Sequence, residues 1–356
     1  MKLAIVHDWF IRPGGAERVL CSLHRLWPEA PIYFLVADRA AVRKYLPDAT
    51  VRISGVGRVP LAARLYSMLA PVLPAAVESL DLSAFDMVLS NSVLFSKGIV
   101  VRPGTRHVSY CYSPSRPLWD RAVDYERRGP FSRLARHMLR TWDFAAAQRP
   151  DQFVAISRTA ADRIDRYYRR DSIVLPPPTP LLPAGSADPD AAPYFLVVSR
   201  LVPHKRLAVI IDAFNRTRTR LVIAGSGPLE RSLRRRAGPT VSFAGAVDDT
   251  RLAALYRNAI AVVMANDEDW GLTAVEAMAY GTPVLALRDG GATETVLEGV
   301  TGEFFDEPIM EAIVDGIKRL TSRLASYDRE GIRRYAHQWS EERWAPRMRA
   351  LIEPVA

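Results

Sequence analysis

Cysteine is scarce in this chain of 356 residues, which contains only Cys21 and Cys111. Two cysteines cannot form a disulfide framework or a thiolate metal site, and so few of them favour a reducing cytoplasm. A signal peptide is not expected either, because the opening apolar stretch is short and has the pattern of a strand. We therefore expect a cytoplasmic protein.

Long apolar runs are also missing from the sequence, so no segment is predicted to span a bilayer. The nearest candidate is residues 59–80, which is interrupted by Arg64, Pro71, Pro74 and Glu78. This stretch predicts an amphipathic or buried pair of helices.

Acidic residues are outnumbered by basic ones, 39 against 48, which gives a formal net charge of +9. Such a balance favours an anionic partner. The arginines are dense between residues 116 and 140. This stretch is either a solvated helical face or a contact with lipid phosphate or an anionic membrane. Nucleic acid is disfavoured because no recognition motif accompanies the charge. The residues expected to face an acceptor or a membrane are Arg116, Arg127, Arg128 and Arg133.

Short apolar runs alternate with longer helical patterns along the chain, which indicates a parallel α/β architecture. A proline-rich stretch at residues 176–193 separates two such halves. We expect domains at residues 1–178 and 179–335, followed by a helical segment at 336–356. The expected strands are 3–6, 32–35, 87–90, 153–156, 195–199, 221–224, 241–243, 261–264 and 283–287.

Glycines follow the first expected strand at Gly14 and Gly15, directly before a helix. Such a turn lets the backbone approach a ligand, and the helix start presents free N–H groups to an anion. A tight turn without a ligand would use the same residues, so this motif alone decides neither reading.

Arg200 and Lys205 follow the first strand of the second half, at the edge where ligands of open α/β sheets bind. Two cations there can neutralise a diphosphate, each charge-assisted hydrogen bond contributing roughly 1.5–3 kcal/mol. A pair of solvated cations is the alternative. The following strand ends before Gly225 and Gly227, a second glycine turn at the same edge, which weakens that alternative.

Residues 266–283 form the most specific block, running from a strand through a loop into a helix. Glu268 lies in the loop and can accept hydrogen bonds from sugar hydroxyls, while Glu276 lies about one turn inside the helix. Complementing the helix dipole is the alternative role for such acids. A fourth turn with Gly290 and Gly291 follows the next strand. The donor-binding residues expected from this block are Glu268, Trp270, Gly271, Leu272, Thr273 and Glu276.

Together these blocks resemble the family-4 retaining glycosyltransferases, which have the GT-B fold of two facing Rossmann-like domains. His7-Asp8-Trp9, residues 14–17 and residues 110–116 look most like the mannosyltransferase branch of bacterial surface-polysaccharide biosynthesis. The resemblance implies transfer of a hexose, mannose from GDP-mannose in that branch or the sugar of a UDP-sugar, to a lipid-linked saccharide or similar acceptor. It also implies a peripheral position at the inner face of the cell membrane.

The resemblance assigns roles to individual residues. Arg200 and Lys205 would hold the donor pyrophosphate. Glu268 and Glu276 match the family's Glu-x7-Glu motif, the first facing the transferred sugar and the second the ribose. Gly15 would approach the donor phosphates, and the C-terminal helix would cross back onto the first domain.

Tyr112 departs from the family, whose members usually carry a histidine at this position that contacts the donor sugar. Three alternatives follow: Tyr112 takes the role, His107 takes it instead, or donor preference and activity differ from the branch. Because Tyr112 occupies the matching position, we place it with Glu268, Arg200 and Lys205 among the catalytic residues.

No metal and no cofactor besides the nucleotide-sugar co-substrate are expected, because we find no Asp-x-Asp motif in a loop suited to a divalent cation. Arg200, Lys205 and helix starts would stabilise the leaving diphosphate instead.

Three other function classes compete with this interpretation. A hydrolase or sugar-nucleotide epimerase would need paired carboxyls, about 5–10 Å apart in a hydrolase. A non-catalytic nucleotide-sugar-binding protein stays open because of Tyr112. A dinucleotide-dependent oxidoreductase is disfavoured because no complete G-x-G-x-x-G follows the first strand.

Overall fold

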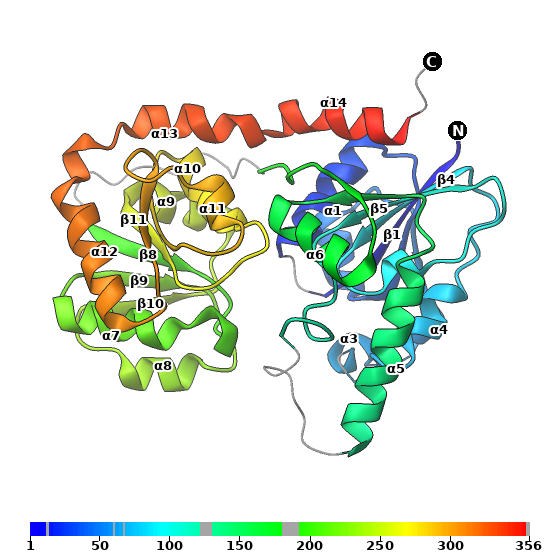
Figure 1. Ribbon diagram of the computed structural model, residues 1–356, viewed down its shortest axis with the longest axis horizontal. Coiled ribbons are helices and arrows are strands. Elements are labelled where there is room, and N and C mark those ends of the chain that lie inside the picture. The colour runs from blue at the N-terminus through cyan, green and yellow to red at the C-terminus, as the bar shows by residue number, and fades with distance from the viewer. Residues whose placement is uncertain (12–13, 60, 67, 122–129, 180–191, 354–356) are drawn as a thin grey trace. The chain divides into compact units, whose positions relative to one another are not determined.

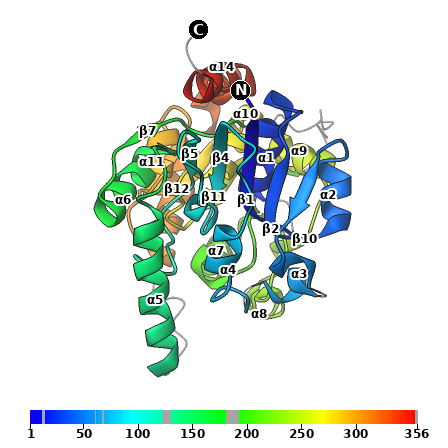
Figure 2. The ribbon, with the colours of Figure 1, turned by 90° about the vertical axis from the view of Figure 1, so that its right-hand side faces the viewer.

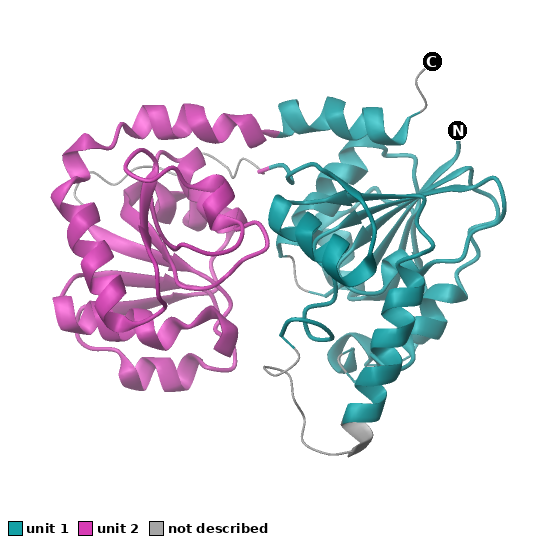
Figure 3. Cartoon of the chain, in the orientation of Figure 1, with its two compact units in different colours: residues 1–178, 341–356 teal, residues 179–340 magenta. Residues whose placement is uncertain are grey.

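The chain divides into two compact units in a computed structural model that describes residues 1–11, 14–59, 61–66, 68–121, 130–179 and 192–353. Unit 1 contains residues 1–178 and 341–356, and unit 2 contains residues 179–340 (Figure 3). The chain returns to unit 1 at Glu341, five residues after the position 336 expected from the sequence. The reason is that Trp339 still packs in unit 2, with its ring 5.5 Å from that of Trp270.

Unit 1 is built on a seven-stranded parallel sheet with the order β3-β2-β1-β4-β5-β6-β7 (Figures 1 and 2). Its strands are β1 (Leu3–Phe10), β2 (Ile32–Ala37), β3 (Val51–Ile53), β4 (Met87–Ser92), β5 (Arg106–Cys111), β6 (Gln152–Ala155) and β7 (Ser172–Val174). Its longer helices are α1 (Gly15–Leu26), α2 (Arg39–Tyr45), α5 (Pro130–Ala146) and α6 (Arg158–Tyr168). Shorter elements are η1 (Val56–Arg58), α3 (Ala62–Leu65), α4 (Leu73–Glu78) and η2 (Ser96–Gly98).

Unit 2 is built on a six-stranded parallel sheet with the order β10-β9-β8-β11-β12-β13. Its strands are β8 (Tyr194–Val198), β9 (Leu221–Ala224), β10 (Val241–Gly245), β11 (Ala259–Met264), β12 (Val284–Leu287) and β13 (Gly302–Phe305). Its helices are α7 (Leu207–Thr217), α8 (Glu230–Arg236), α9 (Asp249–Asn258), α10 (Leu272–Ala279), α11 (Ala292–Thr295), α12 (Met310–Ser322) and α13 (Arg329–Ala336), with 3-10 turns η3 (Pro203–Lys205), η4 (Leu324–Ser326) and η5 (His337–Trp339).

Buried apolar strands explain why both sheets are parallel. The central strands β1, β4, β8 and β11 are almost wholly buried, as expected for strands that helices cover on both faces. In each sheet the chain order reverses beside the first strand, between β1 and β4 in unit 1 and between β8 and β11 in unit 2. Such a switch point leaves a crevice at the carboxyl ends of the strands, where ligands of open α/β sheets bind.

The helical segment expected at residues 336–356 begins with a 3-10 turn and contains one shorter helix. Helix α13 ends at Ala336, and α14 (Glu341–Ile352) begins after η5. Helix α14 packs on unit 1, where Glu341 accepts hydrogen bonds from Ser22 (3.1 Å) and Arg25 (2.9 Å) of α1. Met348 and Ile352 are completely buried. In the described part of the chain, no helix has the length and apolar character needed to cross a bilayer.

Asp8 stabilises the backbone at the switch point of unit 1. Its buried carboxylate accepts hydrogen bonds from four consecutive N–H groups after β4, those of Val93 (2.7 Å), Leu94 (2.9 Å), Phe95 (2.6 Å) and Ser96 (2.8 Å). Buried N–H groups without partners are costly. The carboxylate therefore stabilises the turn that carries the chain out of β4.

Replacing Asp8 is expected to destabilise unit 1. In Asp8→Ala the four N–H groups lose their acceptor, and we expect a loss of at least about 3 kcal/mol because each hydrogen bond to a charged group contributes about 1.5–3 kcal/mol. Urea unfolding followed by circular dichroism measures the loss. Asp81→Ala is the matched control, since Asp81 caps an exposed turn at Ser83; a loss equal to that of this control would contradict the assignment.

Candidate functional site

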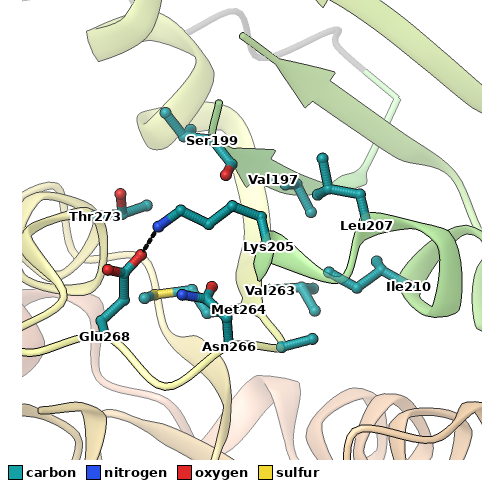
Figure 4. Close-up of a pocket in the computed structure, with 12 residues that line it drawn as sticks. Val197, Ser199, Lys205, Leu207, Ile210, Val263, Met264, Asn266, Glu268 and Thr273 are labelled. Carbon is teal, nitrogen blue, oxygen red and sulfur yellow. Dashed lines mark hydrogen bonds and ion pairs between the residues drawn. The ribbon is translucent and has the colours of Figure 1, made fainter. Parts of the chain in front are cut away.

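Lys205 and Glu268 meet at the switch point of unit 2. Lys205 ends η3, which follows β8, and Glu268 lies in the loop that follows β11. The Lys205 Nζ donates a hydrogen bond to Glu268 Oε1 and forms an ion pair with it (Figure 4). Both sequence motifs therefore converge in one pocket, which is also lined by Ser199, Asn266 and Thr273.

Glu268 is ionised at neutral pH. Burial alone would raise the pKa of this carboxyl, but the charge of Lys205 and its hydrogen bond lower the pKa to about 2. Neither side chain is fully exposed: 14% of the Lys205 side chain and 29% of the Glu268 side chain are accessible. The pocket thus holds a cation and an anion that neutralise each other.

The start of α10 lies beside this ion pair. Gly271 caps the helix in the left-handed conformation, with φ of 83°. Thr273, the second residue of the helix, lines the pocket (Figure 4). The first N–H groups of any helix lack partners within it, so this end can donate to an anion.

Arg200 is exposed after β8, and no ion pair of its guanidinium is found among the described residues. Its backbone carbonyl accepts a hydrogen bond from Val202 (3.0 Å), which fixes the loop that carries it. Arg200 is therefore a cation on the same loop as Lys205 whose charge is available to a ligand.

The predicted glycine turns serve the backbone around the site. A Cβ atom at Gly225, where φ is 134°, would overlap the Ser199 carbonyl oxygen, and one at Gly227 would lie 2.5 Å from the Leu201 carbonyl oxygen. At Gly290 a Cβ atom would overlap the Glu268 carbonyl oxygen in the same way. These turns pack against the loops that carry Arg200 and Glu268. The prediction from the sequence was instead that the backbone of such turns approaches a ligand.

Trp270 and Glu276 are buried away from the pocket lining. Trp270 is 4% exposed and packs edge-to-face on Trp339. Glu276 is 7% exposed on α10 and accepts a hydrogen bond from the Tyr256 hydroxyl of α9 (2.8 Å). In this conformation the two residues hold the loop and the helix of the site, and Tyr256 is a partner that spacing along the sequence could not reveal.

Gly14 and Gly15 stand where α1 begins, at the switch point of unit 1. The Gly14 N–H donates to Glu17 Oε2 (2.8 Å), and Glu17 Oε1 lies 3.9 Å from Nε2 of His7, a residue within β1. Burial alone would lower the pKa of His7, but the nearby carboxylates of Glu17 and Asp8 and the backbone contact with Asn91 raise it above its ordinary value. That His7 and Glu17 lie close together was not predicted from the sequence.

Tyr112 follows β5 at this same edge of unit 1. Its hydroxyl lies within hydrogen-bond distance of Asn91 Oδ1 (2.9 Å) and of the Ala16 carbonyl (3.2 Å). Burial raises the pKa of Tyr112 well above its usual value, so the phenol stays neutral. Asn91 could have been predicted as a site residue from the sequence, because it is a polar residue near the end of an apolar strand.

The alternative in which His107 replaces the usual family histidine is wrong. His107 is completely buried within β5, where its Nε2 lies 2.9 Å from Ser90 Oγ. Burial, with a smaller contribution from the charge of Arg149, lowers the pKa of His107 to about 3. It lies five residues before Tyr112, inside the sheet and away from the edge where β5 ends.

The arginines expected to face an acceptor or a membrane are placed differently from one another. The Arg116 side chain is only 14% exposed and pairs with Asp120 (3.2 Å), which also binds Arg163. Arg133 is exposed on α5. Arg127 and Arg128 lie outside the described residues.

Asp267 and Asp269 flank Glu268 with the spacing of an Asp-x-Asp motif. The spacing is therefore present in the sequence, and the expectation that the protein uses no metal stays a prediction. Among the residues that the structure describes, no group of three or more His, Cys, Asp or Glu side chains is placed to hold a metal ion.

A buried ion pair under α5 was also missed. Lys97 Nζ lies 2.6 Å from Asp143 Oδ1, and both side chains are almost inaccessible. The other oxygen of Asp143 accepts hydrogen bonds from Trp119 (2.7 Å) and Tyr168 (2.9 Å). No spacing along the chain links these residues, since they come from η2, α5, α6 and the loop after β5.

The match to a known protein family lies in unit 2. A family model described as "Glycosyl transferases group 1" matches residues 181–339, nearly all of unit 2 and less than half of the chain. The D-inositol 3-phosphate glycosyltransferase 2 of Catenulispora acidiphila is 36% identical over 194 residues, which cover 49% of this chain and 44% of that protein. The GDP-mannose-dependent alpha-(1-6)-phosphatidylinositol dimannoside mannosyltransferase of Mycobacterium tuberculosis is 33% identical over 153 residues, or 42% of this chain and 39% of that protein. The chain thus spans less than half the length of these relatives.

Solved structures resemble the chain over nearly its full length. Sucrose-phosphate synthase of Thermosynechococcus elongatus has a TM-score of 0.76 at 18% identity and covers 99% of this chain and 98% of its own. Anabaena HepE, solved with UDP and glucose, has a TM-score of 0.73 at 16% identity over 100% of both chains. The expected fold is confirmed: two Rossmann-like parallel-sheet units of the GT-B type, with a C-terminal helix that packs on the first.

Removing the charge of Lys205 is expected to change how stability depends on pH. Because the folded-state pKa of Glu268 is below its ordinary value, the ion pair stabilises unit 2 above about pH 4.5, and this contribution is lost as the pH falls toward 2. In Lys205→Met the pKa of Glu268 should rise, since only burial remains. The thermal midpoint of the variant should therefore lie below that of the wild type at neutral pH and approach it in acid.

Lys318→Met is the control for this measurement, because Lys318 is an exposed lysine of the same unit. Its midpoint should follow the wild type at every pH. A deficit of Lys205→Met that does not change between pH 7 and acid would contradict the ion pair as the source of the shift.

Proposed function

We propose that the chain is a retaining glycosyltransferase that moves a hexose from a nucleotide diphosphate donor to an acceptor hydroxyl. The observation that carries this proposal is the convergence of Lys205, Glu268 and the start of α10 at the switch point of unit 2. The match of this unit to a glycosyl transferase family model supports it. We place the chain in the family-4 mannosyltransferase branch that its motifs resemble.

Lys205, Arg200 and the start of α10 supply positive potential where the leaving diphosphate would develop charge. In a transferase the bond between the anomeric carbon and the phosphate oxygen breaks while the acceptor oxygen bonds to that carbon. Groups that are already oriented toward the departing charge lower the barrier most. The acceptor proton passes to the departing phosphate, which requires no additional base.

Glu268 would accept hydrogen bonds from hydroxyls of the transferred sugar. Its pKa of about 2 keeps it ionised at neutral pH, so that both carboxylate oxygens can accept such bonds. In the absence of donor its partner is Lys205, so donor binding exchanges one internal ion pair for two ligand contacts: Lys205 turns to phosphate and Glu268 to the sugar. Glu276 would bind the ribose, in competition with the Tyr256 hydroxyl.

Mannose from GDP-mannose is the donor that we propose, with a lipid-linked saccharide of surface-polysaccharide biosynthesis as acceptor. A relative at 33% identity over part of the chain is named as GDP-mannose-dependent and as acting on a phosphatidylinositol mannoside. A UDP-sugar is the alternative donor, since Anabaena HepE was solved with UDP. The net positive charge favours a peripheral position on the inner face of the cell membrane.

Arg200 offers the clearest test of the diphosphate site, because it is exposed and its removal leaves no known internal partner unpaired. Arg200→Met should lower kcat/KM for the donor by roughly 10- to 100-fold, which corresponds to one charge-assisted hydrogen bond. Initial rates with GDP-mannose and UDP-glucose measure this effect and identify the donor. Lys318→Met should leave the rates unchanged.

Two outcomes would overturn the proposal. Release of free sugar or an epimer as the main product would identify a hydrolase or epimerase. Stabilisation of the protein by a nucleotide-sugar, without transfer to any of a panel of lipid-linked and free saccharides, would identify a binding protein.

Metal independence is a separate prediction. With cations of the chain at the diphosphate, EDTA should leave turnover intact, and Asp267→Asn with Asp269→Asn should change it by less than about threefold. Steady-state rates with and without EDTA test this. Loss of turnover in EDTA that Mn²⁺ restores, and that the double variant reproduces, would show that the Asp-x-Asp spacing binds a metal.

A further inference from the structure

The described residues between 56 and 72 of unit 1, which are all but 60 and 67, expose an unusual number of apolar side chains, and we call them the apolar-arginine segment. The segment runs from η1 through α3 to the residue before α4. Five of the sixteen large apolar side chains that are exposed in the described part of the chain belong to it. They are Val59 (56% exposed), Leu61 (59%), Leu65 (43%), Met68 (68%) and Val72 (46%).

The opposite side of the segment is packed on the core, so its exposure is not that of a detached loop. Ala62 is 4% exposed, and Ala63, Tyr66 and Leu69 pack against the same buried cluster. The Tyr66 ring lies 5.5 Å from that of Trp9. A firmly attached element thus presents an apolar outer face, whereas contiguous exposed apolar patches on soluble proteins commonly mark interaction sites.

The charge of the segment has one sign only. Arg58 and Arg64 are exposed, and no acidic residue occurs between Asp48 and Glu78. Apolar side chains interspersed with arginines are the composition of segments that lie in a membrane interface, where the apolar groups enter the acyl boundary and the arginines reach lipid phosphates.

Leu61 is held in the left-handed conformation, with φ of 64°. Its carbonyl accepts the N–H groups of Arg64 (2.8 Å) and Leu65 (3.0 Å), so the residue begins α3. This conformation is uncommon for a bulky residue, and an asparagine or glycine would adopt it more readily. An exposed leucine at this position is therefore explained by neither burial nor local backbone preference, and strained residues of this kind often lie at functional sites.

A second exposed apolar face lies at the same end of unit 1. Both views show α3 at the end of the unit toward which the N-terminal half of α5 projects (Figures 1 and 2). That half exposes Leu134 (58%) and Met138 (64%) together with Arg133. The N-terminal half of α5 and the apolar-arginine segment therefore share one end of the unit.

We propose that the apolar-arginine segment docks unit 1 on the surface of an anionic lipid bilayer. A second copy of the chain is a poorer occupant, because a symmetric interface through this face would bring the arginines of both copies together with no acid of the segment to compensate. This proposal deepens the membrane association under the proposed function but uses no residue of the donor site. Vesicle binding in the absence of donor tests it, so its failure is distinguishable from a failure of the transferase assignment.

The test is cosedimentation of the full chain with phosphatidylcholine vesicles, either pure or containing about one third phosphatidylglycerol. The wild type should bind the anionic vesicles and bind the neutral ones at least tenfold more weakly. Leu65→Glu with Met68→Glu should lower the affinity for anionic vesicles by roughly tenfold or more, because two buried apolar contacts become two repelled charges. Arg58→Gln with Arg64→Gln should lower it roughly tenfold, and this loss should shrink as salt is added.

The matched control is Val300→Glu with Ile309→Glu in unit 2, at residues that are 60% and 43% exposed. This pair carries the same added charge and should bind within about twofold of the wild type. Thermal midpoints of all variants check that they are folded, as expected for changes at exposed positions.

Three results would overturn the proposal. The first is wild-type protein that binds neither kind of vesicle. The second is full binding by both segment variants, even if Leu134→Glu with Met138→Glu abolishes it, because docking would then belong to α5. The third is a dimer in analytical ultracentrifugation that Leu65→Glu with Met68→Glu converts to a monomer, because the face would then join two copies of the chain.

Discussion

The ion pair between Lys205 and Glu268 is the interaction on which the candidate site depends. It joins the loops after β8 and β11, the two strands between which the sheet of unit 2 changes direction. The charges of Lys205 and Glu268 neutralise each other in the pocket. A ligand can replace this ion pair if it binds both side chains. The nucleotide-sugar that we propose as donor would do so, since its diphosphate is anionic and its sugar hydroxyls donate hydrogen bonds. A ligand with only one of these groups would leave the other charge unpaired, which is a source of selectivity.

Glycine turns and aromatic anchors hold that pair in position. Gly225 and Gly290 let neighbouring turns pack on the backbone of the two loops, where any side chain would collide. Trp270 is fixed against Trp339 immediately after the loop that carries Glu268. The residues of the conspicuous sequence block therefore divide into a few that face the pocket and several that support it. In unit 1, Asp8 has a comparable supporting role under the turn after β4.

Much of this architecture could be predicted from the sequence, because a buried parallel strand is a continuous apolar run and its carboxyl end shares an edge with its neighbours. This rule predicts that Lys205 and Glu268 lie at one edge of the sheet. Strand β5 could not be predicted in the same way, because its sequence Arg-His-Val-Ser-Tyr-Cys is not an apolar run and His107 and Ser109 are buried polar residues. The burial of Trp270 and Glu276 could not be predicted either, since their partners Trp339 and Tyr256 are distant in sequence and only packing brings them together.

The packing of α14 on α1 makes unit 1 discontinuous along the chain, with Trp344, Met348 and Ile352 filling its surface only after the whole of unit 2 has intervened. Unit 2 is therefore one continuous stretch of chain, whereas unit 1 needs α14, from beyond unit 2 in the sequence, to cover its apolar side. Contacts between residues so distant in sequence form slowly. Unit 1 therefore cannot complete its apolar core before α14 packs on it.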